Sequence, residues 1–426
     1  MCVSMCRLVI GRKSSVTSAP AVSPQSVALI FVPYITSLGG EERLLLSLSE
    51  WLHLRRCSHC VVCFDDTLGL ASYATWPLQV VCLRPHRSVL REVFALRRYL
   101  SGRKAEIAGR ILAVTMRSAI YCGLLAPAEF VMQVDDPPTL LPTDISRQAL
   151  SARRAWPALR AVERGSILRV ARAEIVHRLT RRGIRNARCV SVPTHRTAKE
   201  LLALYGITSE VIPQGVKPPA SQAPRGHGLR SPLRFLSVSR LEPNKRIDWI
   251  LRALALLERH APPLSARMPW VLDIVGQGSE GARLEVLALE LGLRAKVEFH
   301  GRVSDERLDT IYQQAGIFLM PAVQGYGLPA LEALIRQVPV LIHQDSGVCE
   351  VLQGSPWVEV VDEGFEALAE GISCLISRLA QPEVWRAPLP VIRTDQQWAE
   401  QVAVICGWNR PPSLHAAKNV AQRSTC

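Results

Sequence analysis

A short glycine loop at residues 321–332, with the sequence PAVQGYGLPALE, has the composition of a phosphate-binding site. Because Gly325 and Gly327 lack side chains, backbone N–H groups can approach an anion closely, and the dipole of a following helix favours negative charge there. Buried strands are predicted on both sides, at 316–320 and 338–342, so the loop lies at the carboxyl end of a strand. Open α/β sheets bind ligands at such ends. Taken alone, the loop is equally compatible with an ordinary turn.

A turn upstream of this loop carries two cations. Residues 235–245 predict a strand followed by a turn that contains Arg240 and Lys245, and the helix that follows has its apolar residues on one face. Arg presents a planar fork to phosphate and Lys a mobile point charge, so the pair suits a pyrophosphate that gains charge as it leaves. The alternative is a solvated turn with two surface cations.

Together the two motifs resemble the retaining nucleotide-sugar glycosyltransferases of family 4. This GT-B group includes bacterial mannosyl-, glucosyl- and galactosyltransferases of the cell envelope. The second domain of the family opens with a strand, Gly-Arg-Leu, three further residues and Lys. Arg240, Leu241 and Lys245 match this pattern, whereas Ser239 replaces the Gly.

Further motifs of the second domain follow in the family's order. Residues 275–278 match Val-Gly-x-Gly, residues 297–301 match Val-x-Phe-x-Gly, and a helix is predicted at 305–314. The glycine loop corresponds to the family's Glu-x7-Glu signature. Glu332 keeps the second Glu of that signature, but Gln324 takes the place of the first.

The first half of the chain agrees more loosely with the family. Residues 26–34 predict an apolar strand, and residues 38–43 resemble the Gly-Gly-x-Glu turn of the first loop, which puts Gly39 and Gly40 at the cleft. The last strand, helix and strand of the first domain are matched by 190–194, 199–205 and 211–216. The resemblance covers most of residues 26 to 355 and is weakest between 65 and 185.

The resemblance implies a GT-B fold, an α/β architecture of two Rossmann-like, doubly wound parallel-sheet domains that face a cleft. A chain of 426 residues with an apolar fraction of 48% can form two cores. Residues 217–232 are rich in Pro, Gly, Ser and Arg, as in a linker. The expected organisation is a disordered extension at 1–25, an acceptor domain at 26–216, the linker at 217–232, a donor domain at 233–380, a helical segment packing back on the first domain at 381–409, and a disordered tail at 410–426.

The resemblance also implies roles for individual residues. Arg240 and Lys245 are expected to stabilise the departing pyrophosphate, and Gln324 to contact hydroxyls of the donor sugar, so these three are the expected catalytic residues. Glu332 is expected to bind the ribose hydroxyls of the nucleotide. The rest of the donor site is expected to comprise Gly39, Gly40, Gly276, Gly325, Tyr326, Gly327 and Leu328.

Asp135 and Asp136 are candidate cleft acids, because they lie in a segment where family members often place a His. Adjacent acids also raise the alternative of a metal-dependent GT-A transferase, in which they bind a divalent cation on the diphosphate. A GT-A enzyme is usually one domain that binds its nucleotide in its first half, whereas the donor motifs here all follow residue 235. We therefore expect no metal cofactor.

A second alternative is a catalytically degenerate GT-B scaffold or subunit. The replacements at Ser239 and Gln324 favour it, as does Gln337 at a position where a Gly is usual. Retention of Arg240, Lys245 and Glu332 together argues against it, because a decayed site would be free to lose them. The expected function is transfer of a sugar from a UDP- or GDP-sugar to a glycan or lipid-linked acceptor, in cell-envelope polysaccharide or lipopolysaccharide biosynthesis.

The formal net charge of +14 requires an anionic partner or an Arg-rich solvated surface. Residues 86–100 form a basic amphipathic run, and between 147 and 188 only Glu163 and Glu174 oppose a series of arginines. Peripheral association with an anionic membrane is one interpretation, and solvated helical faces are another. Nucleic acid is not favoured, because aromatic residues are not interleaved with the arginines. The series consists of Arg147, Arg153, Arg154, Arg160, Arg164, Arg169, Arg172, Arg178, Arg181, Arg182, Arg185 and Arg188.

Several features bear on cellular location. The chain has no uninterrupted apolar run of roughly eighteen residues, so no transmembrane helix is expected, and residues 1–25 lack the apolar centre of a signal peptide. The twelve cysteines are spread through strand and helix patterns, which favours reduced thiols. Residues 57–63 could supply zinc ligands, but 60–64 also predict a strand. We expect a cytoplasmic protein, and peripheral association with the inner face of the membrane is one of the two interpretations of its basic surface.

Overall fold

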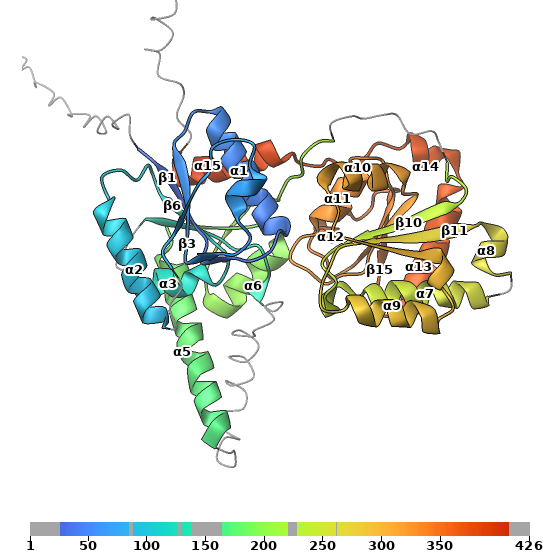
Figure 1. The fold of residues 1–426 in the computed structure, drawn as a ribbon, viewed down its shortest axis with the longest axis horizontal. Coiled ribbons are helices and arrows are strands. Elements are labelled where there is room, and N and C mark those ends of the chain that lie inside the picture. The colour runs from blue at the N-terminus through green and yellow to red at the C-terminus, as the bar shows by residue number, and fades with distance from the viewer. Residues whose placement is uncertain are drawn as a thin grey trace, which may run out of the picture.

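The computed structural model describes residues 26–84, 88–125, 129–138, 164–219, 228–260 and 262–408, without the side chains of 164–173. Figure 1 shows two α/β domains side by side, each built on a sheet with helices on both faces. The extension expected at 1–25 and the tail expected at 410–426 lie outside the described residues, as does the middle of the expected linker, at 220–227.

The first domain contains a seven-stranded sheet in the order β5-β3-β1-β6-β7-β8-β9, in which all neighbouring strands are parallel. Its strands are β1 (Ala28–Phe31), β3 (His59–Cys63), β5 (Gln79–Cys82), β6 (Ile111–Val114), β7 (Phe130–Gln133), β8 (Cys189–Val192) and β9 (Glu210–Val211). The short strands β2 (Tyr34–Ile35) and β4 (Asp65–Asp66) pair with each other. Its main helices are α1 (Gly40–Leu54), α2 (Val89–Gly102), α3 (Ser118–Leu124), α5 (Arg164–Asn186) and α6 (His195–Tyr205).

The second domain repeats this plan with six parallel strands in the order β12-β11-β10-β13-β14-β15. Its strands are β10 (Leu233–Val238), β11 (Trp270–Val275), β12 (Val297–Gly301), β13 (Ile317–Met320), β14 (Val340–His343) and β15 (Val358–Val361). Its helices include α7 (Ile247–Arg259), α9 (Gly281–Glu290), α10 (Asp305–Gln314), α11 (Leu328–Leu334), α12 (Cys349–Leu352) and α13 (Phe365–Leu379). The two doubly wound sheets confirm the predicted fold class.

The central strands are apolar because both of their faces are covered. In β1, Ala28 and Ile30 belong to the same buried cluster as the apolar residues of α1. Leu29 and Phe31 point the other way and belong to a cluster with residues of α2 and α3. A strand buried on both faces appears in the sequence as a continuous apolar run, which is why β1 could be predicted.

The chain returns to the first domain near its C-terminus. The helix α14 (Pro382–Arg386) packs on α13, whereas α15 (Asp395–Cys406) packs on α1, where Ser47 Oγ donates to Asp395 Oδ2 at 2.9 Å. The returning segment runs beside the outgoing one. Val216 N–H donates to the Arg393 carbonyl and Asp395 N–H to the Val216 carbonyl, both at 3.1 Å. The chain therefore passes between the domains twice, near Val216 and near Arg393, and the two segments lie next to each other.

The helix expected at 199–205 begins earlier, at His195. Thr194 caps it, because its Oγ1 accepts from the Thr197 N–H at 3.1 Å.

Among the described residues, no helix has the length and apolar character needed to cross a bilayer.

Candidate active site

The loops at the centres of the two sheets lie opposite each other. In each sheet the strand order reverses beside the first strand, β1 or β10, and such reversals are where doubly wound sheets bind ligands. A Cβ added to Gly40 would lie 3.3 Å from Leu328 Cδ1 of the other domain. The Gly325 N–H donates to Asp136 Oδ1 at 3.1 Å, again across the domain boundary. The predicted turn at Gly39 and Gly40 therefore faces the glycine loop that begins at residue 321, which we call the donor loop after its predicted role.

The donor loop connects β13 to α11. The carbonyl oxygens of Gln324 and Tyr326 accept from the N–H groups of Gly347 and Val348, at 3.0 and 2.9 Å. Gly327 has φ of +125°, a conformation that residues with a side chain rarely adopt. The loop is thus fixed through its carbonyl groups to the segment that follows β14.

Lys245 contacts the amide at the family's first Glu position. Its Nζ donates to Gln324 Oε1 at 2.5 Å, and Gln324 Nε2 lies 2.9 Å from Met320 Sδ. Burial lowers the pKa of Lys245 to about 8; the Asp136 carboxylate opposes this shift, and the positive charge of Arg240 adds to it. An anion bound here would raise the pKa of Lys245 again, because it stabilises the ammonium.

Arg240 lies in the same turn as Lys245 and has an exposed side chain. Gly276, which follows β11, has φ of +136°, and a Cβ there would collide with the Ser239 carbonyl oxygen. The Ser239 N–H donates to the Val275 carbonyl at 3.1 Å. The glycine of the Val-Gly-x-Gly motif therefore allows the turn with the two cations to lie against the end of β11.

Glu332 lies on α11 and accepts from Tyr312 OH at 3.0 Å. It also interacts with Arg43 of the first domain. Burial tends to lower the pKa of Arg43, but the carboxylates of Glu332 and Asp305 outweigh burial and raise it. Arg43 also donates to Asp305 Oδ1 at 2.8 Å. The sequence did not single out Arg43, although it lies in the first turn of α1, shortly after Gly40.

The two candidate cleft acids follow β7. Asp135 Oδ1 accepts from the side-chain amides of Gln133 and Gln214, at 2.9 and 2.7 Å. Burial is the main reason why the pKa of Asp135 is raised to about 6, and the Asp136 carboxylate adds to the shift. Because Asp136 contacts Gly325, the structure brings both predicted acids to the donor loop.

Glu41 is a third acid in the cleft that the sequence did not single out. Burial raises its pKa well above the usual range, and the neighbouring carboxylates of Asp135, Glu42 and Asp136 add to this shift. Glu42 itself accepts from the Gly39 N–H at 2.8 Å and closes the turn. The only local signal for Glu41 was its position immediately after the glycine pair.

A cluster of hydrogen bonds joins α6 to the second domain beside the donor loop. Glu350, on α12, accepts from the N–H groups of His195 and Arg196 at 2.8 and 2.6 Å. Arg196 Nη1 donates to Asp345 Oδ1 at 2.9 Å. The segment 344–350 therefore contacts both the donor loop and the first domain, so the position of the loop depends on how the domains approach each other.

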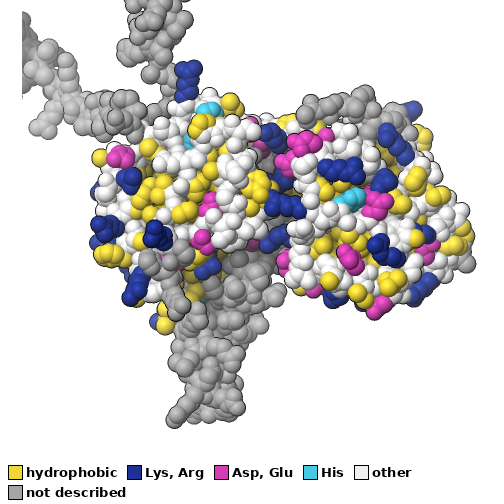
Figure 2. Space-filling model, in the orientation of Figure 1, with side chains coloured by type: hydrophobic (Ala, Val, Ile, Leu, Met, Phe, Trp, Pro, Cys, Tyr) yellow, Lys and Arg dark blue, Asp and Glu magenta, His cyan; other side chains and the backbone are white. Residues whose placement is uncertain are grey.

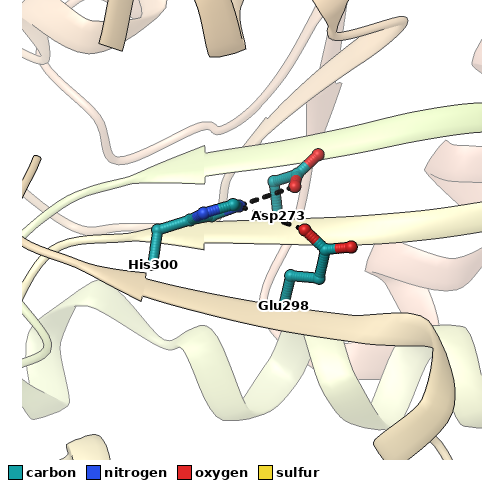
Figure 3. Close-up of side chains that lie close together, drawn as sticks. All are labelled: Asp273, Glu298 and His300. Atoms are coloured by element: carbon teal, nitrogen blue, oxygen red, sulfur yellow. Dashed lines mark hydrogen bonds and ion pairs between the residues drawn. The ribbon is translucent and has the colours of Figure 1, made fainter. Parts of the chain in front are cut away.

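One other group of side chains has the composition of a metal site. Figure 3 shows Asp273, Glu298 and His300, the only such group found in the part of the chain that the structure describes. His300 Nε2 lies 2.7 Å from Asp273 Oδ1, and Arg234 donates to both Asp273 oxygens at 2.8 and 2.9 Å. Because the buried carboxylate already has a cation and an imidazole as partners, we interpret the group as an ion-pair network.

The cysteine segment at 57–63 does not bring its thiols together. Cys60 Sγ lies 4.0 Å from Tyr99 OH, and Cys63 Sγ lies 3.5 Å from Cys82 Sγ of the neighbouring strand. Cys60 and Cys63 belong to buried clusters on opposite faces of the sheet. The zinc site that the spacing could have formed is therefore not built.

Gln324→Glu is expected to change donor preference, and Gln324→Ala to weaken transfer to every donor by about 10-fold. In the position beside the anomeric centre that the resemblance implies, the amide offers both a hydrogen-bond donor and an acceptor, but it lacks the negative charge that would stabilise the positive charge developing there. Initial rates with a panel of UDP- and GDP-sugars measure both effects. Gln313→Ala, at an exposed position of α10, is the control. Wild-type rates for both Gln324 variants on the best donor would mean that Gln324 does not contact the sugar.

Comparison with known protein families points to glycosyl transfer. Residues 224–386 match the family model described as glycosyl transferases group 1. A stretch of 121 residues is 34% identical to an uncharacterized glycosyltransferase of Methanocaldococcus jannaschii and covers 28% of this chain and 29% of that protein. Another of 160 residues is 30% identical to a GDP-mannose-dependent alpha-(1-6)-phosphatidylinositol monomannoside mannosyltransferase of Mycolicibacterium smegmatis, covering 35% and 40%. The chain thus spans well under half the length of these relatives.

Solved structures match over nearly the whole chain. WaaG, a glycosyltransferase involved in lipopolysaccharide biosynthesis, aligns with a TM-score of 0.60 and 18% identity over 90% of this chain and 95% of WaaG. HepE of Anabaena in complex with UDP-glucose aligns with a TM-score of 0.60 and 15% identity over 93% and 99%. At this identity the likeness establishes the fold, which is GT-B. The family match covers residues 224–386, which is less than half of the chain, so the activity of the whole chain is a proposal.

Proposed function

We propose that this chain is a retaining glycosyltransferase of family 4 that transfers a sugar from a UDP- or GDP-sugar to a glycan or lipid-linked acceptor in the cytoplasm. The observation that carries the proposal is the contact of Lys245 with Gln324 at the donor loop. Arg240 lies in the same turn as Lys245, and Glu332 lies on the helix that follows the loop. The similarity to a mannosyltransferase and to a lipopolysaccharide enzyme supports a role in cell-envelope polysaccharide or lipopolysaccharide biosynthesis.

In the proposed reaction, the diphosphate of the donor lies between the donor loop and the two cations. As the bond from the anomeric carbon to the phosphate oxygen breaks, negative charge grows on the diphosphate, and Arg240 and Lys245 stabilise it. The acceptor oxygen attacks from the same face, and the departing phosphate oxygen takes its proton, so that the anomeric configuration is retained. The donor must displace Asp136 from the Gly325 N–H, because that carboxylate occupies the loop in the free protein.

The acceptor is proposed to approach from the first domain. Glu41, Asp135 and Asp136 line that side of the cleft, and the raised pKa values of Glu41 and Asp135 reflect their burial beside one another. Glu332, on the opposite side, is proposed to bind the ribose hydroxyls of the nucleotide. The two oxygens of a carboxylate can each accept a hydrogen bond from one hydroxyl.

A thermal-shift screen of UDP- and GDP-sugars tests the proposal. A nucleotide at ~100 times its dissociation constant is expected to stabilise the protein by roughly 2.7 kcal/mol, because it binds only the folded chain. The donor found in this way is then incubated with candidate glycan and lipid-linked acceptors, and the anomeric configuration of the product is read by NMR. Absence of a shift with every nucleotide would favour the scaffold, and an inverted product would reject the proposed mechanism.

Transfer is expected to survive chelation of divalent cations. The proposed charge partners of the diphosphate are the side chains of Arg240 and Lys245, so the reaction as proposed needs no metal ion to stabilise the leaving group. Initial rates are measured with EDTA and after addition of manganese or magnesium. Complete loss of transfer in EDTA, restored by either metal, would contradict this expectation.

A further inference from the structure

The helix α2 presents apolar side chains to solvent as well as to the core. Its inner face is formed by Glu92, Val93 and Leu96, all of which are buried. On the outer face, Leu90 and Phe94 are 70% and 69% exposed. They lie one helical turn apart, so they form a single apolar ridge. Surface helices usually expose polar residues on this side, and the ridge therefore needs an explanation.

Cations surround this ridge. A surface groove of about 900 Å³ runs along the outer side of α2, and Leu83, Tyr99 and several arginines line it. Arg103 stacks on the Tyr99 ring, with 4.4 Å between the guanidinium carbon and the ring centre, and pairs with Glu106. Among the described residues from 79 to 106, Glu106 is the one exposed acid, whereas the exposed cations are Arg84, Arg91, Arg97, Arg98, Arg103 and Lys104. Figure 2 shows Lys and Arg side chains along this outer edge of the first domain, with hydrophobic side chains among them.

The helix is firmly attached to the domain behind it. The buried Glu92 carboxylate accepts from Tyr34 OH at 2.6 Å and from Tyr121 OH at 2.8 Å. These bonds hold α2 in one orientation, so the outer ridge is presented as a rigid surface. Figure 1 shows α2 on the side of the first domain that faces away from the second domain. The ridge is therefore separate from the cleft and does not depend on the proposed transfer reaction.

We propose that the outer face of α2 docks on an anionic lipid surface, with Leu90 and Phe94 inserted below the headgroups and the surrounding cations bound to lipid phosphates. An apolar ridge within a basic helical face is the pattern of a helix that lies in the plane of a membrane interface. Charge complementarity selects the occupant, because basic residues beside a membrane bind its anionic lipids. The proposal concerns α2 alone. In the arginine series at 147–188, residues 147–163 and the side chains of 164–173 lie outside the described structure.

Co-sedimentation of the full chain with lipid vesicles tests the docking surface. The bound fraction is expected to be about 10-fold higher on vesicles with about 30% phosphatidylglycerol than on phosphatidylcholine alone. It should fall when salt is raised from about 0.1 M to about 1 M, which shortens the Debye length. The variants Leu90→Ser/Phe94→Ser and Arg91→Glu/Arg98→Glu are each expected to lose about 10-fold in binding. Failure of the wild-type chain to bind anionic vesicles would overturn the proposal.

Matched controls lie on the second domain. Val286→Ser/Leu289→Ser changes two exposed apolar residues of α9, and Arg252→Glu/Arg259→Glu reverses two exposed charges of α7. Both controls should bind vesicles as the wild type does, and equal losses in controls and α2 variants would contradict the assignment to α2. Nucleotide affinity and thermal unfolding of the α2 variants should be unchanged. A dimer that dissociates in Leu90→Ser/Phe94→Ser, without any vesicle binding, would identify a second copy of the chain as the occupant instead.

Discussion

Lys245→Ala is expected to lower turnover with the preferred nucleotide-sugar by ~10²–10³-fold, and Arg240→Ala by a similar factor. The role proposed for both side chains is to stabilise charge that grows on the leaving diphosphate, so their loss should weaken the transition state more than the bound donor. The fold should survive, because Arg240 is exposed and Lys245 is half-buried beside the cleft. Steady-state kinetics with an intact donor, together with thermal unfolding, measure both effects. Lys199→Ala and Arg252→Ala, at exposed positions, are the controls.

The pH dependence of donor binding should show, independently of turnover, whether Lys245 contacts the bound donor. Its pKa of about 8 in the free protein means that the ammonium predominates below pH 8 and is lost as the pH rises above it. Since the anionic donor binds the ammonium better, its affinity should fall as the pH rises from 8 towards the higher pKa of the complex. Calorimetric titration of the nucleotide across this range should show the fall in the wild type but not in Lys245→Ala. A pH profile of Lys245→Ala that matches the wild type would show that Lys245 does not face the diphosphate. Aggregation of Lys245→Ala would show that the side chain supports the fold instead.

Gly325→Ala is expected to lower kcat by about 100-fold, a larger loss than the loss of nucleotide affinity. A Cβ at this position would collide with Asp136 Oδ1 and with the Asp135 carbonyl oxygen. The side chain of Asp136 can move away, but the backbone carbonyl cannot, so the first domain must shift away from the donor loop. A displacement of about 1 Å between reacting groups is enough for a loss of this size.

Comparison of kcat with the nucleotide dissociation constant checks the Gly325 prediction. The nucleotide should still bind, because Arg240, Lys245 and Glu332 all belong to the second domain. Gly102→Ala provides the control, since a Cβ there would meet open space. If Gly325→Ala has wild-type kcat, the domains do not approach this closely when the reaction occurs.

The second domain could be predicted well because its signals are local. The helix expected at 305–314 is α10 with the same bounds, and the strand expected at 316–320 is β13, one residue shorter. Continuous apolar runs show strands that are buried on both faces, and the glycines between β13 and α11 mark the loop. The resemblance assigned Lys245 and Gln324 to one donor site, although it implied no contact between them. The structure brings the two side chains together.

Contacts between the domains could not be predicted in the same way. The pairs Asp136–Gly325 and Glu350–His195 join residues that are far apart in the sequence, and no local pattern records how two domains approach each other. The raised pKa of Glu41 has the same origin, because it depends on neighbours that only the folded chain supplies. The roles of these residues in catalysis remain predictions.

The paired crossings at Val216 and Thr394 restrict how the cleft can open. Two adjacent segments that are hydrogen-bonded to each other bend together about one axis but resist twisting, because a twist would break the bonds of Val216 to Arg393 and Asp395. An opening of the second domain about these crossings would therefore be a bend rather than a twist. If the proposed function holds, each closure by such a bend would return the donor loop to the same place opposite the first domain, and the site would form again after a spent nucleotide has left.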